Sequence, residues 1–173
     1  GALSIPTLGG GGFGYDIAAQ FSMALTTKKA GLVPFMFTDS MKPVCERLSG
    51  ISLEVEASCN NQVFAESLLF THRGLSGPVV LQISSYWDPG DEVVINLLPE
   101  LSVPEWLISE KTQHGRSLLR SKLCQKLPAA LVNELQKLWW PESAEKPLAE
   151  FNNKELTTVG SQFNHWALKP SAT

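Results

Sequence analysis

The densest group of reactive side chains in this sequence lies in the stretch FTHRGLSGP, residues 70–78. It places Thr71, His72, Arg73 and Ser76 between the end of an apolar run and the predicted start of a helix. Cationic side chains and the free N–H groups of a helix start bind anions and carbonyl oxygens. The stretch therefore predicts a site for an anionic or carbonyl substrate. The alternative is structural: the hydroxyls satisfy turn and cap hydrogen bonds, while the histidine and the arginine are solvated.

Other kinds of catalytic site find no support in the sequence. A serine-hydrolase elbow, G-x-S-x-G, would need a glycine where Pro78 stands. The cysteines Cys45, Cys59 and Cys124 are odd in number and far apart, which favours buried reduced thiols over disulfides or a zinc site. No paired carboxylates and no nucleophile–base arrangement are visible, so we assign no catalytic residue and no metal ligand.

The glycine-rich stretch GGGGFGYDIAAQF matches a motif, because Gly9, Gly11 and Gly14 have the G-x-G-x-x-G spacing. That motif binds dinucleotides only between a buried strand and a helix, with an acidic residue about 20 positions further on. Here the preceding segment GALSIPTL is short and contains Pro6, and the next acidic residue beyond the stretch is Asp39. We therefore expect a flexible loop that leads into a helix near residue 13 or 14, and no dinucleotide fingerprint.

The composition predicts a folded protein without a membrane-spanning segment. The 173 residues are 43% hydrophobic and 18% charged, which is typical of a globular chain. No apolar run approaches the roughly 18 residues that span a bilayer, and no signal peptide is visible, so we expect a cytoplasmic protein with no membrane partner. The formal charge is −3 and there is no basic cluster beyond Lys28–Lys29, so no nucleic-acid partner is expected.

The first half of the chain has the pattern of a β-rich unit. Strands are predicted at 31–37, 51–58, 63–70 and 92–98, with one helix at 77–87. The segment ISLEVEAS alternates between apolar and polar residues, which is typical of a strand with one wet face. Asn60–Asn61 follows it and predicts the turn of a hairpin, because asparagine tolerates positive φ.

The second half changes to the helical period, which predicts a bundle over residues 103–165. Helices are expected from about residue 116 and from Pro128, and a third follows Asn153 as its N-cap. The pair Trp139–Trp140 is expected to cover the bundle core rather than to stack on a ligand. The residues expected on the inner faces are Leu118, Leu119, Leu123, Leu127, Leu131, Leu135, Leu138, Leu156, Val159, Phe163 and Trp166. The predicted fold class is α+β, a β-barrel-like unit plus a small α-helical bundle.

Several segments occur together in the order seen in one bacterial flavoprotein family. They are LSIPTLGGGGFGYDIAAQF, LVPFMFTD, LSGISLEVEAS, LLFTHRGLSGPVVLQISSYW, INLLP and FNHWALKPS. On these segments the chain resembles the HI-type (YhiN/BaiN-like) NAD(P)/FAD-dependent oxidoreductases, which include aminoacetone oxidase-like proteins. The resemblance covers nearly the whole chain, and FTHRGLSGP is its most specific part.

The resemblance implies that the chain is the insert of a larger flavoprotein. Residues 1–28 would be a segment of the flavin-binding domain, 29–102 with 166–173 a β-barrel-like insert unit, and 103–165 a helical unit. FAD would be bound in the full-length parent and not by this chain alone. The implied function is the substrate-side region of an FAD-dependent oxidoreductase, which shapes the substrate site over the flavin. The alternative is a self-contained protein-interaction module without catalysis.

The resemblance also implies which residues lie near the flavin. The substrate- or flavin-facing candidates are Thr71, His72, Arg73, Gly74, Ser76 and Gly77, and the flavin-proximal loop candidates are Ser4, Pro6, Gly9, Gly12, Gly14 and Tyr15. The expected partners are the remainder of the flavin-binding domain and a small-molecule substrate. Phe13, Ile17 and Phe21 form one helical stripe, and we expect this segment of the isolated chain to be disordered, repacked on the barrel, or buried against a second copy in a dimer or crystal contact.

Overall fold

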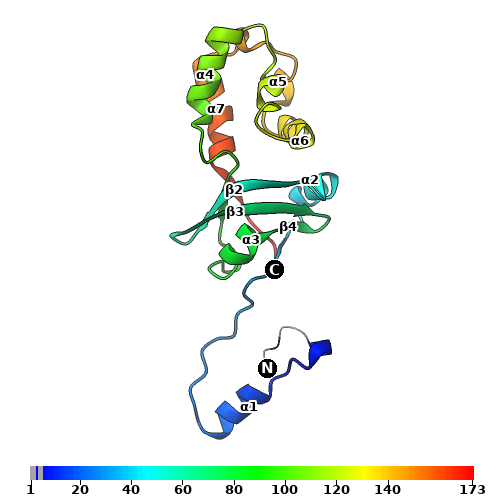
Figure 1. Cartoon of the computed structure of the whole chain (residues 1–173), viewed down its shortest axis with the longest axis vertical. Helices are drawn as coiled ribbons and strands as arrows, with labels where there is room; N and C mark the ends of the chain where they lie inside the picture. The colour runs from blue at the N-terminus through cyan, green and yellow to red at the C-terminus, as the bar shows by residue number, and fades with distance from the viewer. Residues whose placement is uncertain (1–2, 4–5) are drawn as a thin grey trace.

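An antiparallel sheet of six strands forms the middle of the molecule, in a computed structural model that describes residue 3 and residues 6–173 (Figure 1). Its strands are β1 (Phe35–Met36), β2 (Ser52–Cys59), β3 (Gln62–Thr71), β4 (Gly74–Ser76), β5 (Val93–Asn96) and β6 (Trp166–Leu168). They follow the order β1-β4-β3-β2-β5-β6, and neighbouring strands are antiparallel. The sheet curls into a half-barrel, which confirms the predicted β-barrel-like unit.

The long β2–β3 hairpin forms as the sequence pattern predicts. Val55 and Ala57 in β2 and Leu68 and Phe70 in β3 are buried, in the alternation expected of strands with one covered face. The turn at Asn60–Asn61 has φ angles of 48° and 63°. This is the left-handed region that asparagine tolerates better than most residues, and the predicted turn is confirmed.

Two helices cover the sheet. α2 (Met41–Leu48) packs on β3 and β4, and α3 (Pro78–Ile83) packs on β2 and β3. Their buried side chains are Val44, Cys45 and Leu48 in α2, and Val79, Val80 and Ile83 in α3. The sequence pattern does not predict α2, and α3 is shorter than the helix expected at 77–87.

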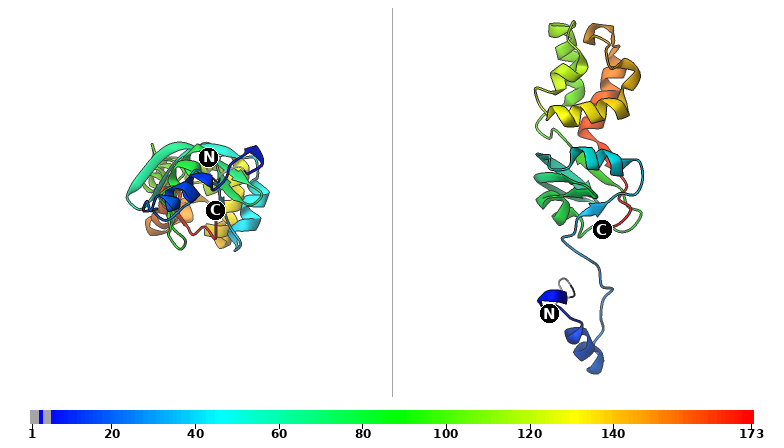
Figure 2. Two further views of the ribbon diagram at one scale, coloured as in Figure 1. Left: turned by 90° about the horizontal axis from the view of Figure 1, so that it is seen from below. Right: turned by 90° about the vertical axis from the view of Figure 1, so that its right-hand side faces the viewer.

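A separate group of helices lies at one end of the half-barrel (Figure 2). Its elements are α4 (Val103–His114), α5 (Leu119–Leu123), α6 (Ala129–Trp139), α7 (Asn153–Asn164) and two short 3-10 helices, η2 (Pro141–Ser143) and η3 (Leu148–Glu150). The predicted α+β class, a barrel-like unit plus a helical bundle, is confirmed. No helix in the described part of the chain is long and apolar enough to cross a bilayer.

Three details of the helical unit differ from the sequence prediction. The N-cap of α7 is Asn152, whose Oδ1 accepts a hydrogen bond from the Glu155 N–H at 2.8 Å, so the expected cap at Asn153 is one residue too late. Leu138 is 42% exposed because it lies on the outer side of the last turn of α6. Trp166 belongs to β6, because α7 ends at Asn164 and the chain then becomes extended.

The N-terminal segment lies apart from the sheet (Figure 1). It contains η1 (Pro6–Leu8) and α1 (Phe13–Gln20), and α1 begins where a helix is predicted. Residues 22–34 then run to the sheet without helix or strand, so most of the strand predicted at 31–37 is absent. Pro34 has no N–H to donate, and only Phe35–Met36 reaches a neighbouring strand.

The apolar stripe of α1 is uncovered in the single chain. The exposed fractions of Phe13, Ile17 and Phe21 are 75%, 39% and 70%. Repacking of the stripe on the barrel does not occur in this structure, and its burial in a dimer stays a prediction.

The half-barrel and the helical unit are joined by an ion pair between Arg47 of α2 and Glu134 of α6, whose Nε and Oε2 atoms are 2.8 Å apart, and by the half-buried side-chain amide of Asn164. Asn164 Nδ2 donates to Asn96 Oδ1 at 2.9 Å and to the carbonyl oxygens of Leu98 and Leu101 at 3.1 and 2.9 Å. Its Oδ1 accepts from the Val103 N–H at 2.9 Å. We call this set of bonds the Asn164 clasp. It ties the end of β5, the connector at 97–102 and the first residue of α4 to the last residue of α7.

Close packing between α4 and α7 supports the clasp. A Cβ atom on Gly160 of α7 would lie 2.8 Å from the backbone N and Cα of Pro104. Real Cβ atoms do not approach backbone atoms so closely, so glycine lets the two helices meet at their bases. The same approach brings Asn164, one turn further along α7, next to the connector.

Replacing Asn164 with alanine is expected to lower the free energy of unfolding by about 2 kcal/mol, because the buried Val103 N–H and the half-buried Leu101 carbonyl lose their side-chain partner. Urea unfolding followed by tryptophan fluorescence measures the change. Asn133→Ala is the matched control, since Asn133 is exposed on α6. Equal stability of the two variants would show that the clasp contributes nothing.

Candidate functional site

The FTHRGLSGP stretch forms the turn of the β3–β4 hairpin. Thr71 and Gly74 are paired across it, and His72 and Arg73 are the two exposed residues at its tip. The Thr71 hydroxyl accepts hydrogen bonds from the Gly74 N–H at 3.2 Å and from the Arg73 N–H at 3.4 Å. The threonine thus has the structural role considered above, and it holds the two exposed residues in place.

Two glycines let β4 fit between its neighbours. A Cβ atom on Gly74 would collide with the carbonyl oxygen of Phe35 in β1. Gly77 has a φ of 94°, and a Cβ atom there would lie 2.6 Å from the carbonyl oxygen of Ser67. Both glycines are therefore required by the backbone, whether or not they also face a flavin.

The start of α3 does not join this turn. Ser76 pairs with Leu69 inside β4, and Gly77, without a side chain, occupies the N-cap position. The predicted helix start is thus confirmed, with Gly77 rather than Ser76 as the cap and Pro78 as the first residue. Because β4 is extended, roughly 10 Å of strand separates the turn from the helix start, so helix N–H groups do not converge with His72 and Arg73.

A pocket of about 300 Å³ opens beside the turn. It is lined by Met36, Phe37, Thr38, Lys42, Arg73 and Ala172. Arg73 comes from the hairpin, Lys42 from α2 and Thr38 from the loop between β1 and α2. Two cationic side chains and a hydroxyl beside one small pocket suit an anion or a carbonyl oxygen. We call Thr38, Lys42 and Arg73 the cationic site.

Sequence reasoning finds Arg73 but misses Lys42 and Thr38. No local signal marks them, since neither belongs to a motif. Tertiary structure brings them together, because the Phe37 N–H donates to the Arg73 carbonyl oxygen at 3.0 Å and so places the loop after β1 against the turn. Lys42 has only a long contact, 3.8 Å, with Glu46.

The two ends of the barrel unit meet at this same place. The Met36 N–H donates to the Ala172 carbonyl oxygen and the Ser171 N–H donates to the Met36 carbonyl oxygen, both at 2.8 Å. The Thr38 hydroxyl also lies 3.0 Å from the Ser171 hydroxyl. The segment that arrives from residue 34 and the C-terminal segment therefore lie side by side next to the cationic site (Figure 1).

The glycine-rich loop lacks the setting of a dinucleotide site. The 3-10 helix η1, and not a strand, precedes it, and Gly12 is the N-cap of α1. Gly14 and Tyr15 lie in the first turn of α1, with the Lys28 ammonium 4.3 Å from the centre of the Tyr15 ring. Gly9 has a φ of 84° just after η1.

The two candidate sets are not brought together in this structure. Residues 22–34 alone connect α1 to the sheet, and α1 lies away from the β3–β4 turn (Figure 1). Ser4 lies outside the described residues, and Pro6 begins η1. The flavin-proximal role of the loop stays a prediction.

The cysteines offer no reactive thiol in the barrel. Cys45 and Cys59 are buried as expected, and burial raises the pKa of the Cys45 thiol to about 12. Cys124 is exposed, which corrects the prediction that all three are buried. Within residue 3 and residues 6–173, no three His, Cys, Asp or Glu side chains gather as metal ligands.

Comparison with known proteins gives one matching family and two relatives that have the same name. The family described as "HI0933-like protein barrel and H2TH domain" matches residues 29–173. "Ribosomal RNA dihydrouridine synthase" of Escherichia coli (strain K12) is 40% identical over 174 residues, covering 100% of this chain and 43% of the relative. The protein of the same name from Haemophilus influenzae (strain ATCC 51907 / DSM 11121 / KW20 / Rd) is 38% identical over 177 residues, with the same coverage. The chain spans less than half the length of these relatives, and neither is named an aminoacetone oxidase.

Thr71→Val is expected to cost about 1 kcal/mol of stability and to loosen the turn that presents His72 and Arg73, because the hydroxyl bonds are lost. Hydrogen exchange of the Gly74 amide should accelerate. Thr157→Val, at an exposed position of α7, is the control and should leave that amide unchanged. Unaltered exchange at Gly74 in Thr71→Val would show that the hydroxyl does not hold the turn.

Proposed function

The chain belongs to the HI0933-like barrel and H2TH domain family, and on this premise we propose that it is the substrate-side region of a flavin-dependent enzyme that reduces uridine in ribosomal RNA. The name of the two relatives supports the reaction and the substrate. The cationic site beside the β3–β4 turn supports the proposal that this end of the half-barrel meets the substrate. The proposal replaces the small-molecule substrate expected above.

One observation supports the proposal that the end of the half-barrel with the β3–β4 turn faces the substrate. The strand at Met36 and the segment at Ala172 lie side by side next to Arg73. We infer that the remainder of the parent, including its flavin-binding domain, connects through these two segments. A domain attached at both of them faces the β3–β4 turn, which supports the substrate- or flavin-facing role of Thr71, His72, Arg73 and Gly74.

The flavin itself is proposed for the parent and not for this chain. The described residues contain no strand–loop–helix unit that would cradle a dinucleotide, so this chain alone does not fit FAD. FAD bound elsewhere in the parent would supply the reducing equivalents. We propose that residues 1–28 belong to that flavin-binding domain, and the uncovered stripe of Phe13, Ile17 and Phe21 supports this.

The cationic site is proposed to hold the RNA beside the reacting uridine. Arg73 and Lys42 offer N–H donors for a phosphate or for a uracil carbonyl oxygen, and the Thr38 hydroxyl adds a third polar group. His72, exposed at the tip of the turn, is proposed to orient the uracil carbonyl. The expectation of no nucleic-acid partner rested on the net charge of −3 and on the lack of a basic cluster in the sequence, and neither reveals that the fold brings Lys42 beside Arg73.

The second candidate, a self-contained protein-interaction module, is favoured by one observation. The apolar stripe on α1 is exposed and would suit a protein partner or a second copy of the chain. The cationic site has no role in that alternative, and we therefore prefer the enzyme.

Arg73→Gln in the full-length parent should lower kcat/KM for rRNA uridine reduction by about tenfold or more, because a charge-assisted contact to the substrate is lost. The measurement is the dihydrouridine content of rRNA over time, with flavin absorbance recorded for each variant. Arg116→Gln, an exposed arginine of the helical unit, is the control. Equal activity of the two variants, with flavin retained, would remove Arg73 from the proposed site.

The isolated chain should be colourless and should not bind FAD with useful affinity, because no complete phosphate-cradling unit is present. Titration with FAD, followed by flavin fluorescence and by absorbance after desalting, measures this. Stoichiometric yellow protein would show that the chain carries its own flavin site.

A further inference from the structure

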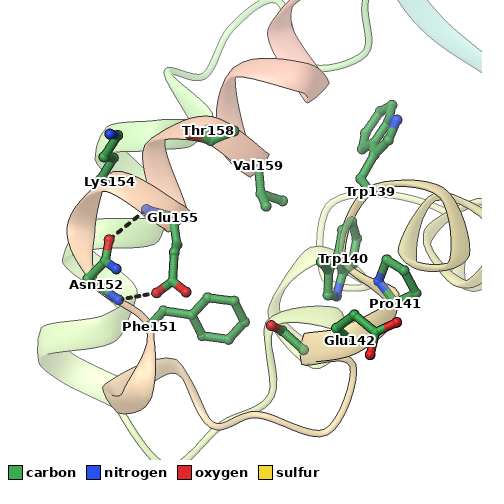
Figure 3. A pocket seen from close by; sticks show the side chains of 11 residues that line it. Trp139, Trp140, Pro141, Glu142, Phe151, Asn152, Lys154, Glu155, Thr158 and Val159 are labelled. Carbon is green, nitrogen blue, oxygen red and sulfur yellow. Dashed lines mark hydrogen bonds between the residues drawn. The ribbon is translucent and has the colours of Figure 1, made fainter.

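A second pocket lies in the helical unit, at the end of the molecule away from the cationic site (Figure 3). Its volume is about 390 Å³, and it opens between the end of α6 with η2 and the first turns of α7. Trp139, Trp140, Pro141, Phe151 and Val159 form its apolar lining. The volume suffices for a planar ring, and no part of the function proposed above uses it.

The aromatic walls of this pocket are held in place by the core. The Trp139 ring packs edge-on against Phe163 and Trp166, with ring centres 4.8 and 5.6 Å apart. Trp140 is 4% exposed and lies against Phe163 at 5.9 Å. The two tryptophans therefore cover the bundle core, as expected from the sequence, and the half-buried Trp139 also presents part of its rigid ring to the pocket. Rigid aromatic side chains are the usual platform on which unpaired bases stack.

The lining offers both donors and acceptors, because the Glu142 carboxylate is among its polar groups. Trp140 Nε1 is buried and has no hydrogen-bond partner among the described residues. Asn152 uses its Oδ1 to cap α7, and the Glu155 carboxylate is occupied by the Asn152 N–H at 2.6 Å and by Lys146 at 3.3 Å. A ligand that carries carbonyl oxygens would complement these donors.

One lysine lies at the edge of the pocket. Lys154 belongs to the lining and forms no ion pair within the described part of the chain. Glu142 lines the opposite side in Figure 3. A strand whose base enters the pocket would place a phosphate near Lys154 and away from Glu142.

We propose that this pocket binds one unpaired base of an RNA strand, with Lys154 facing a flanking phosphate. The inference rests on the proposed function in one respect, that the parent acts on ribosomal RNA. A flat ring with carbonyl oxygens matches the aromatic walls and the unpartnered Trp140 Nε1 donor, and a phosphate matches Lys154. A proline-rich peptide would use the walls but would leave Lys154 without a role.

The test uses the 173-residue chain and a fluorescein-labelled hexauridylate RNA, with binding followed by fluorescence anisotropy. Thr158→Phe fills the pocket from an exposed helix position, and it should weaken binding about tenfold or more. Thr157→Phe adds the same ring at the neighbouring exposed position outside the lining, and should bind as the unaltered chain does. Circular dichroism of both variants verifies that they are folded.

The charge arm of the test compares two lysine variants. Lys154→Glu should weaken binding and reduce its salt dependence, whereas Lys126→Glu, outside the pocket lining, should do neither. Equal binding by Thr158→Phe and Thr157→Phe would overturn the proposal, as would an RNA that does not bind at all. Binding of a proline-rich peptide that Thr158→Phe abolishes, with RNA binding unaffected, would also overturn it.

This experiment separates the two proposals. RNA binding that depends on the pocket, in a protein whose parent does not reduce uridine, supports the pocket and removes the proposed reaction. Uridine reduction by the parent, with no effect of Thr158→Phe on RNA binding, supports the reaction and removes the pocket.

Discussion

The arrangement of the half-barrel and the helical unit depends on the hydrogen bonds of one half-buried side-chain amide, that of Asn164. The connector at 97–102 has no strand or helix of its own, so few of its backbone groups are paired in regular structure. Asn164 donates to the carbonyl oxygens of Leu98 and Leu101 and at the same time accepts from the first N–H of α4. The chain leaves the sheet after β5 and returns to it at β6. The Asn164 clasp therefore holds the outgoing connector at 97–102 against the end of α7, from which the chain returns. The helical unit is thereby held at one end of the half-barrel.

This arrangement separates two surfaces of different chemistry. The end of the barrel where Met36 meets Ala172 carries Arg73 and Lys42, whereas the far end carries the aromatic pocket around Trp140. A single nucleotide is too small to reach both (Figure 1). Under our two proposals the substrate is therefore an extended RNA, held by phosphates near the reacting uridine and by a stacked base further along. Such two-point binding would give affinity without a strongly basic surface, in keeping with the acidic net charge.

Local patterns predicted those parts of the fold whose side chains are sorted by a regular repeat. The β2–β3 hairpin and its Asn60–Asn61 turn follow from alternation and from the backbone preference of asparagine. The prediction was wrong where the outcome depends on a neighbour. The run before Phe35 is apolar enough for a strand, but no strand lies beside it. The pattern also leaves the cap of α3 open between Ser76 and Gly77, and pairing with Leu69 takes Ser76 into β4.

The amino-acid pattern was therefore sufficient for the α+β class, the hairpin, the helical second half and the position of the His72–Arg73 turn, because these follow from backbone sterics and periodic burial over a few residues. Tertiary structure alone decided that Lys42 and Thr38 join Arg73, and that Trp140 and Asn152 line one pocket. Thr38 and Lys42 lie more than 30 residues before Arg73 and belong to no motif, and η2 and η3 separate Trp140 from Asn152. The contacts among these residues depend on the register of the curled sheet and on the Asn164 clasp. Such long-range constraints cannot be recognised in a short stretch of sequence.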